Sequence, residues 1–279
     1  MAVWIIARLT IHGASRRRVL WAMLLLGGAF LALYAFGLGV VRGEVEEELA
    51  GSEIALSQFV KNFFLMAGLY AADFLIVMMT VLISIDTLAG EVDSQTIQSI
   101  AVKPLRRAEI VLGKWLGLAG VLAVYTALLV AGVMLTSASV MGYATPKPLP
   151  GLALIYLESL LLLNLTLLGG TRLATLANGA VVFGLHGLAF IGGWIGQFGS
   201  LIGNSGAASV GRFSNLIMPT EGLWRRAAFE MQPALSGFAR FITPFSGGGV
   251  PGREIVGYAI VLAALALLLA VWQFNRRDL

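Results

Sequence analysis

The chain contains no cysteine, and it has only two histidines among its 279 residues. Without thiols it forms no disulfide, cysteine-ligated zinc site or iron–sulfur cluster, and it carries out no thiol catalysis. The histidines belong to different regions: His12 lies near the start of the chain and His186 within an apolar segment. We therefore expect no metal site, and we interpret His186 as a packed or hydrogen-bonded helix residue.

Charged residues are also scarce. They form 12% of this chain, whereas soluble domains contain about 25%. Hydrophobic residues form 58%, and the mean hydropathy is +0.87, which predicts an integral membrane protein. No polar interval is long enough for a soluble domain, so we expect one membrane domain over residues 1–279. The net charge of +4 needs no nucleic-acid partner, because basic residues are expected beside membrane spans.

The sequence patterns of several enzyme classes are missing as well. The chain has no GxxxxGK(S/T) loop for nucleotide phosphates, no HExxH metalloprotease motif and no GxSxG nucleophile motif. We therefore expect no catalytic residues and no cofactor in this chain. An intramembrane enzyme is the least favoured class of function.

Six apolar segments are long enough to cross a bilayer, whose core of about 30 Å needs roughly 20 helical residues. The predicted fold is therefore all-α, a polytopic membrane protein with six transmembrane helices. The first apolar run is longer than the core of a signal peptide, so we interpret it as a retained span. The expected spans are 19–41, 62–85, 115–141, 151–170, a fifth from about residue 173, and 255–274.

Glycines indicate how some of these helices pack. The stretch 173–211 carries no formal charge and is too long for one span, so we expect a glycine-rich return at 192–203 that re-enters the membrane. Gly113/Gly117 and Gly192/Gly196 are GxxxG pairs, which let helices approach closely. We expect these pairs to serve packing within one subunit, with dimerisation as the alternative.

The N-terminal residues 2–18 predict a helix that lies along the membrane. Arg8, His12 and Arg16 fall on one narrow polar stripe, and the rest of that surface is apolar. This pattern is typical of an interfacial amphipathic helix. We expect residues 2–18 to form an elbow helix that contacts membrane lipids before the first span.

The second long polar interval, residues 204–254, precedes the last span. Within it, 219–231 begins with a helix-start pattern and is predicted to form a short helix on the outer surface. Trp224 is expected at the membrane–water interface, where an indole has apolar contact and water. We expect 204–254 to be an extracytoplasmic segment.

An even number of spans places both termini on one side of the membrane. The majority of the 19 Lys and Arg residues lie in the intervals on that side. Because cytoplasmic loops carry the excess of basic residues, we predict that both termini are cytoplasmic. The expected location is the plasma membrane, which here means a bacterial inner membrane.

Residues 86–114 are the most polar stretch between two apolar segments, and they carry charges of both signs. A bilayer core does not accept so many charges, so this stretch is expected in the cytoplasm. Within it, 94–102 predicts a short helix with an apolar stripe that includes Ile97 and Ile100, and Pro104 ends it. The simple alternative is a solvated loop. We favour a docking surface for a soluble partner.

The same stretch resembles a known family of membrane proteins. Its pattern D…GE…T…P…R…GK is similar to the loop between the second and third spans of type 2 (ABC-2) permease subunits of ATP-binding-cassette exporters. The six spans, the N-terminal helix and the ending 274–279 also resemble these subunits. The residues of the pattern are Asp86, Gly90, Glu91, Thr96, Pro104, Arg107, Gly113 and Lys114.

The resemblance implies a permease that moves a substrate using ATP hydrolysed by a separate ABC ATPase subunit. It implies a homodimer of permeases with two ATPases, which bind ATP and Mg, and it makes 94–102 a coupling helix. An ATP-independent secondary transporter or channel is the alternative. For the cargo, a lipid, drug, peptide, ion or cofactor-maturation role stays open. The residues implied in ATPase coupling are Asp86, Gly90, Glu91, Thr96, Ile97, Ile100, Pro104, Arg107 and Lys114.

Asp73 lies near the middle of the second expected span. A carboxylate there costs at least ~2.5–3.5 kcal/mol on insertion scales, so it should not face lipid. A water-filled path, a protonated form and a partner such as Asn164 or Thr166 are all open. The resemblance places the second span beside the transport route, and we therefore name Asp73 and Asn164 as possible cargo-path residues. A buried carboxyl that is hydrogen-bonded between helices is the structural alternative.

Overall fold

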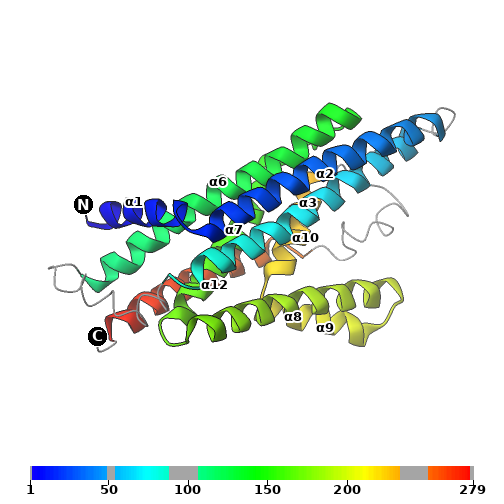
Figure 1. Cartoon of the computed structure of the whole chain (residues 1–279). Coiled ribbons are helices and arrows are strands. Elements are labelled where there is room, and N and C mark those ends of the chain that lie inside the picture. The colour runs from blue at the N-terminus through cyan, green and yellow to red at the C-terminus, as the bar shows by residue number, and fades with distance from the viewer. Residues whose placement is uncertain (1, 49–53, 88–105, 233–250, 277–279) are drawn as a thin grey trace.

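The computed structural model describes residues 2–48, 54–87, 106–232 and 251–276. These ranges contain nine helices and no strand (Figure 1), which confirms the all-α prediction. Six of the helices are long and apolar enough to cross a membrane, at the expected places in the chain. These six are α2 (Arg18–Glu48), α3 (Ile54–Ser84), α6 (Arg107–Met141), α7 (Pro148–Gly170), α8 (Thr175–Leu201) and α12 (Glu254–Asn275). The shorter helices are α1 (Ala2–Ser15), α9 (Ser205–Ile217) and α10 (Thr220–Met231).

Local sequence signals explain where α6 begins and ends. The Glu109 carboxylate accepts a hydrogen bond of 3.1 Å from the backbone N–H of Arg106, next to the positive end of the helix dipole. At the other end Gly142 has a φ of +62°, a left-handed conformation that glycine adopts without strain. Pro148 then begins α7 at a position where its missing N–H has no helical partner to lose.

The α7 helix lies at the centre of the molecule, in contact with α3, α6, α8, α10 and α12. The α2, α3 and α6 helices run side by side on one flank, and α8 and α9 form an antiparallel pair on the other (Figure 1). Both ends of the chain lie at the same end of the bundle (Figure 1), as six crossings require.

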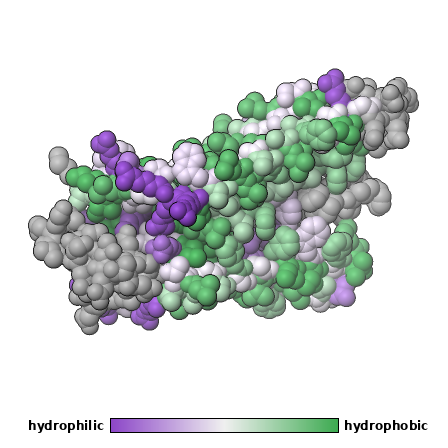
Figure 2. All heavy atoms as spheres, in the orientation of Figure 1, coloured by the Kyte–Doolittle hydropathy of each residue, from purple (hydrophilic) through white to green (hydrophobic). Residues whose placement is uncertain are grey.

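The surface of the bundle suits a bilayer. Apolar side chains cover most of the visible flank, whereas hydrophilic ones gather where α1 meets α2 (Figure 2). Large hydrophobic side chains on candidate spans are well exposed, among them Leu25, Val124 and Leu268. Exposed apolar residues of this size on a long helix are expected where lipid, or another subunit, covers them.

The α1 helix packs along α6, and two glycines of α6 make this contact possible. A Cβ at Gly113 would lie 2.6 Å from the Cβ of Ile6, and one at Gly117 would lie 2.7 Å from the Ala7 carbonyl oxygen. Any larger residue would push the two helices apart. This GxxxG pair therefore serves packing within the chain, as expected.

The glycine-rich return lies at the C-terminal end of the predicted stretch 192–203. The α8 helix continues through the glycines to Leu201, and the chain turns only at 202–204, where Gly203 has a φ of +71°. The glycines instead allow α9 to approach: a Cβ at Gly196 would lie 2.7 Å from the Cα of Gly211. Helical backbone hydrogen bonds survive this arrangement, so close packing explains the glycines better than a break does.

The predicted helix at 219–231 corresponds to α10, but it is largely buried and not on the outer surface, and the expectation for Trp224 is wrong. Its side chain is buried, and its ring centroid lies 5.1 Å from that of Tyr70 in α3. The reason is that α9 first returns along α8. The α10 helix then starts beside the middle of α8, with Thr220 next to His186, and packs inward against α7.

Candidate functional site

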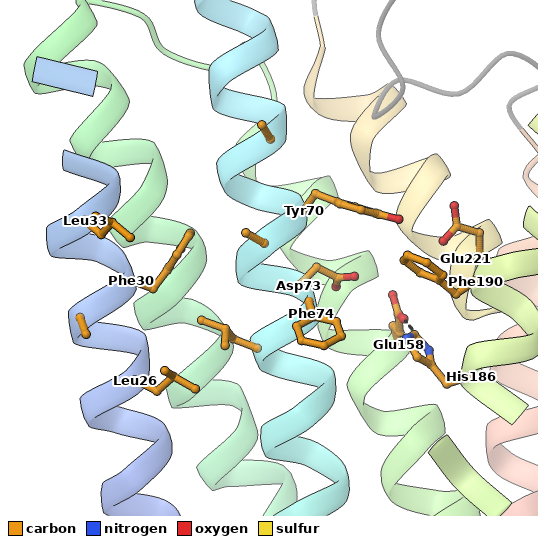
Figure 3. Close-up of a pocket in the computed structure, with 14 residues that line it drawn as sticks. Leu26, Phe30, Leu33, Tyr70, Asp73, Phe74, Glu158, His186, Phe190 and Glu221 are labelled. Atoms are coloured by element: carbon orange, nitrogen blue, oxygen red, sulfur yellow. Dashed lines mark ion pairs between the residues drawn. The ribbon is translucent and has the colours of Figure 1, made fainter. Parts of the chain in front are cut away.

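A cavity of about 660 Å³ lies where α2, α3, α7, α8 and α10 meet. Small-molecule sites typically enclose about 300–1,000 Å³. Most of its lining side chains are apolar, but three carboxylates from three helices share it (Figure 3): Asp73 of α3, Glu158 of α7 and Glu221 of α10. We call it the carboxylate cavity.

Asp73 is buried on the inner side of α3, with 6% of its surface exposed. Its Oδ1 atom has no hydrogen-bond partner among the described residues. The expectation that this side chain does not face lipid agrees with its burial. The structure places it on the cavity wall and gives no hydrogen bond to Asn164 or Thr166, the partners considered from the sequence.

Glu158 is more deeply buried, with 1% of its surface exposed. Neither of its carboxylate oxygens has a hydrogen-bond partner among the described residues. The nearest basic atom recorded is Nδ1 of His186, 3.9 Å from Oε1. That nitrogen also lies 3.2 Å from the hydroxyl oxygen of Thr220, so His186 is a hydrogen-bonded helix residue, as predicted.

Glu221 differs from the other two carboxylates because it has a fixed cation. Nε of Arg225, one turn along α10, donates to its Oε1 over 3.1 Å. The same guanidinium donates to the Gly193 carbonyl and to Gln197 Oε1 of α8. Burial raises the pKa of Glu221 to about 7, although the neighbouring Arg225 acts to lower it.

Aromatic side chains line the cavity beside the carboxylates. The rings of Tyr70 and Phe190 are stacked, with centroids 6.2 Å apart. The Tyr70 hydroxyl accepts a hydrogen bond of 2.8 Å from the indole N–H of Trp194, which holds the ring in place. The cavity thus combines acidic groups with a fixed aromatic pair.

Asn164, the second predicted cargo-path residue, has a different environment. Its Oδ1 accepts a hydrogen bond of 2.6 Å from the indole N–H of Trp115, and its Nδ2 donates to the Ala263 carbonyl over 2.9 Å. It therefore ties α6, α7 and α12 together and is not part of the cavity lining. A role in the cargo path stays a prediction for this residue.

A second polar region lies at the two ends of the 86–114 stretch. The Lys114 ammonium is buried and donates to the Thr87 carbonyl over 2.9 Å, which joins the end of α3 to the start of α6. Asp86 lies 3.9 Å from the guanidinium of Arg17, between α1 and α2. Arg107 donates to the Asn275 carbonyl over 3.4 Å. We call these three the loop-end contacts.

The structure therefore places Asp86, Arg107 and Lys114 of the predicted coupling residues. The expected helix at 94–102 lies outside the described residues, and its docking role stays a prediction. The same is true of the other coupling residues: Gly90, Glu91, Thr96, Ile97, Ile100 and Pro104.

A sequence model of a protein family, described as ABC-2 family transporter protein, matches residues 4–279. The chain belongs to the ABC-2 transporter family. It is a membrane permease of that family, as the resemblance in its central loop indicated. Members of the family are transmembrane subunits without catalytic activity of their own. No curated protein matches the chain.

The permease offers no evident metal centre in the part that the structure describes. No group of three or more His, Asp or Glu residues there could hold a metal ion. The three carboxylates of the cavity sit on different helices, and most of the other lining side chains are apolar.

Sequence reasoning found one of the three cavity carboxylates as a site candidate. Glu158 carried the same signal as Asp73, an ionisable residue within an apolar span, and could have been named by the same argument. Glu221 carried no such signal, because it lies in a polar interval. Only the return of α9 along α8 brings α10, and with it Glu221, against the permease core.

Proposed function

We propose that this ABC-2 permease exports a cargo across the plasma membrane using ATP hydrolysed by a separate ATPase subunit. The ATPase docks on residues 86–114, binds ATP and Mg, and drives movement of the spans. Membership of the family supports this proposal. The loop-end contacts carry it, because they connect the docking stretch firmly to the rest of the permease.

The contact between Lys114 and Thr87 is the firmest of these connections. Removing an ammonium from water costs free energy unless the group is hydrogen-bonded. The hydrogen bond from buried Lys114 to the Thr87 carbonyl is therefore expensive to break. A displacement of the loop therefore moves the end of α3 and the start of α6 together. The pair of Asp86 and Arg17 is more exposed and contributes less.

The α1 helix packs beside the start of α6. It contacts the first turns of α6, where Gly113 and Gly117 allow its backbone to come close. Movement of α6 at this point is therefore passed to α1. We propose that α1 is the interfacial elbow helix and that it lies on the cytoplasmic face. We also propose that it moves with α6 when the ATPase hydrolyses ATP.

The assembly that we propose contains two permease copies and two ATPases. Both termini are cytoplasmic, and α9 and α10 of the segment 204–254 pack into the bundle from the other side. The distribution of basic residues supports this orientation. The exposed apolar side chains of α2, α8 and α12 provide surface for lipid and for the second copy.

Copurification tests the proposed partnership. The permease is expressed with a candidate ABC ATPase subunit, and the complex is assayed for cargo-stimulated ATP hydrolysis and for transport. We expect a stable complex and transport that stops without ATP. Transport by the permease alone, with no ATPase bound, would instead identify a secondary transporter or channel.

The orientation has its own test, which the absence of native cysteine makes clean. Lys147 and Arg172 are exposed residues that flank α7 at opposite ends. Lys147→Cys should react with an impermeant thiol reagent in intact cells, and Arg172→Cys only after the membrane is opened. The reverse pattern contradicts the proposed topology.

A further inference from the structure

We propose that the carboxylate cavity binds an amphiphilic organic cation, a molecule with an apolar body and one ammonium-like positive charge. The inference deepens the proposed function, because we take this molecule to be the cargo. The binding site itself stands on the geometry of the cavity and needs no ATPase.

The first argument is the unmatched negative charge. Asp73 and Glu158 are buried, both present unpartnered oxygens, and both point toward the interior of the cavity (Figure 3). Among the described residues, the basic groups beside these carboxyls are Arg225, which is bound to Glu221, and the His186 ring, 3.9 Å from Glu158. Away from water an unpartnered carboxyl ionises only when a cation lies close to it, and otherwise it keeps its proton. A ligand cation between Asp73 and Glu158 supplies that charge.

The second argument is the aromatic pair. Tyr70 and Phe190 line the same space, and their rings are stacked against each other. The faces of aromatic rings attract cations, most strongly where water is excluded, and sites for quaternary ammonium groups use this attraction. Carboxylates and aromatic faces in one enclosure therefore select a weakly hydrated organic cation.

The third argument is the apolar remainder of the cavity. Leu26, Phe30 and Leu33 of α2 and Phe74 of α3 form much of its wall. Leu33 is 69% exposed and Phe74 54% exposed, and both lie on candidate spans, so this side of the cavity faces the bilayer. A molecule that partitions into lipid can enter there. A strongly hydrated inorganic ion would lose its water against this apolar wall, which is costly.

The test uses two ions of the same shape and opposite charge. The purified permease is placed in nanodiscs of zwitterionic lipid without ATPase, and binding of tetraphenylphosphonium and tetraphenylborate is measured by equilibrium dialysis. Binding to empty nanodiscs is subtracted. We expect saturable binding of the phosphonium and none of the borate. Equal binding of the two ions would show a merely hydrophobic cavity and overturn the proposal.

Two variants locate the site. Asp73→Asn with Glu158→Gln preserves shape and removes both unmatched charges, and it should weaken phosphonium binding at least about tenfold, or ~1.4 kcal/mol. Glu230→Gln is the matched control, because Glu230 is paired with Arg226 and does not line the cavity. It should bind as the unmodified protein does. Equal affinities in the two variants would place the phosphonium elsewhere and refute the assignment.

Folding of the double variant is checked by size-exclusion elution and melting temperature in the same nanodiscs. If it does not fold, Phe190→Leu replaces it, because this change keeps an apolar side chain and removes the aromatic face. Unchanged phosphonium affinity in Phe190→Leu also contradicts the proposal. Loss of ATPase docking leaves these binding measurements intact, so failure of the site and failure of the proposed function are distinguishable.

Discussion

The loop-end contacts and the carboxylate cavity are two charged regions in a largely apolar molecule, and they differ in how their charged groups are paired. At the loop ends each charge meets a partner: Lys114 meets the Thr87 carbonyl, Asp86 meets Arg17, and Arg107 reaches a carbonyl of α12. In the cavity Asp73 and Glu158 share the space without a lysine or arginine partner, and the nearest basic group is the His186 ring, 3.9 Å from Glu158. The paired groups at the loop ends hold neighbouring helices together. The unpaired carboxyls of the cavity offer a binding site for a ligand.

The largest expected effect comes from breaking the docking stretch. Glu91→Lys together with Arg107→Glu reverses two charges of the predicted ATPase surface. Transport should fall to background while membrane insertion stays normal, because the spans themselves are unchanged. ATP hydrolysis and transport are measured in the reconstituted complex.

Arg212→Glu is the control for this prediction, since Arg212 is exposed on α9, away from the loop ends. It should transport normally. Coupled turnover and normal assembly in the Glu91/Arg107 variant would disprove the docking assignment.

The next effect concerns the cavity and separates its two possible roles. Asp73→Asn keeps size and hydrogen-bonding capacity but removes the charge. If the charge serves transport, the variant assembles normally and loses cargo-stimulated ATP hydrolysis, while basal hydrolysis continues. The assay compares basal and stimulated rates in the complex. Full transport by Asp73→Asn would leave this residue a structural role only.

The smallest effect tests rigidity at the loop ends. Lys114→Met removes the buried ammonium and leaves the Thr87 carbonyl without this donor, which should cost about 1–3 kcal/mol of stability. Arg17→Gln removes the more exposed pair with Asp86 and should cost at most about 1 kcal/mol. Melting temperatures of the two variants give the comparison. A larger loss for Arg17→Gln would mean that the exposed pair is the main connection.

Sequence patterns predicted the six spans because hydrophobic length is a local property that each segment carries by itself. The start of α6 is equally local, since Glu109 closes its own first turn. The same reasoning required Asp73 to avoid lipid, and the residue is buried. It spread the return over 192–203, whereas α8 continues to Leu201, because glycine marks close approach as well as a turn.

The sequence by itself therefore determined the class of the molecule and its number of candidate spans. It also showed that an acid at the middle of α3 is energetically costly unless it avoids lipid. Only the tertiary structure decided which groups line the carboxylate cavity together with Asp73. Glu158, Glu221 and Phe190 come from three other helices, and no spacing along the chain relates them to Asp73. The physical reason is that burial and charge pairing depend on distances between helices. Those distances are set by small residues such as Gly193 and Gly196, where side chains or backbones of other helices come close.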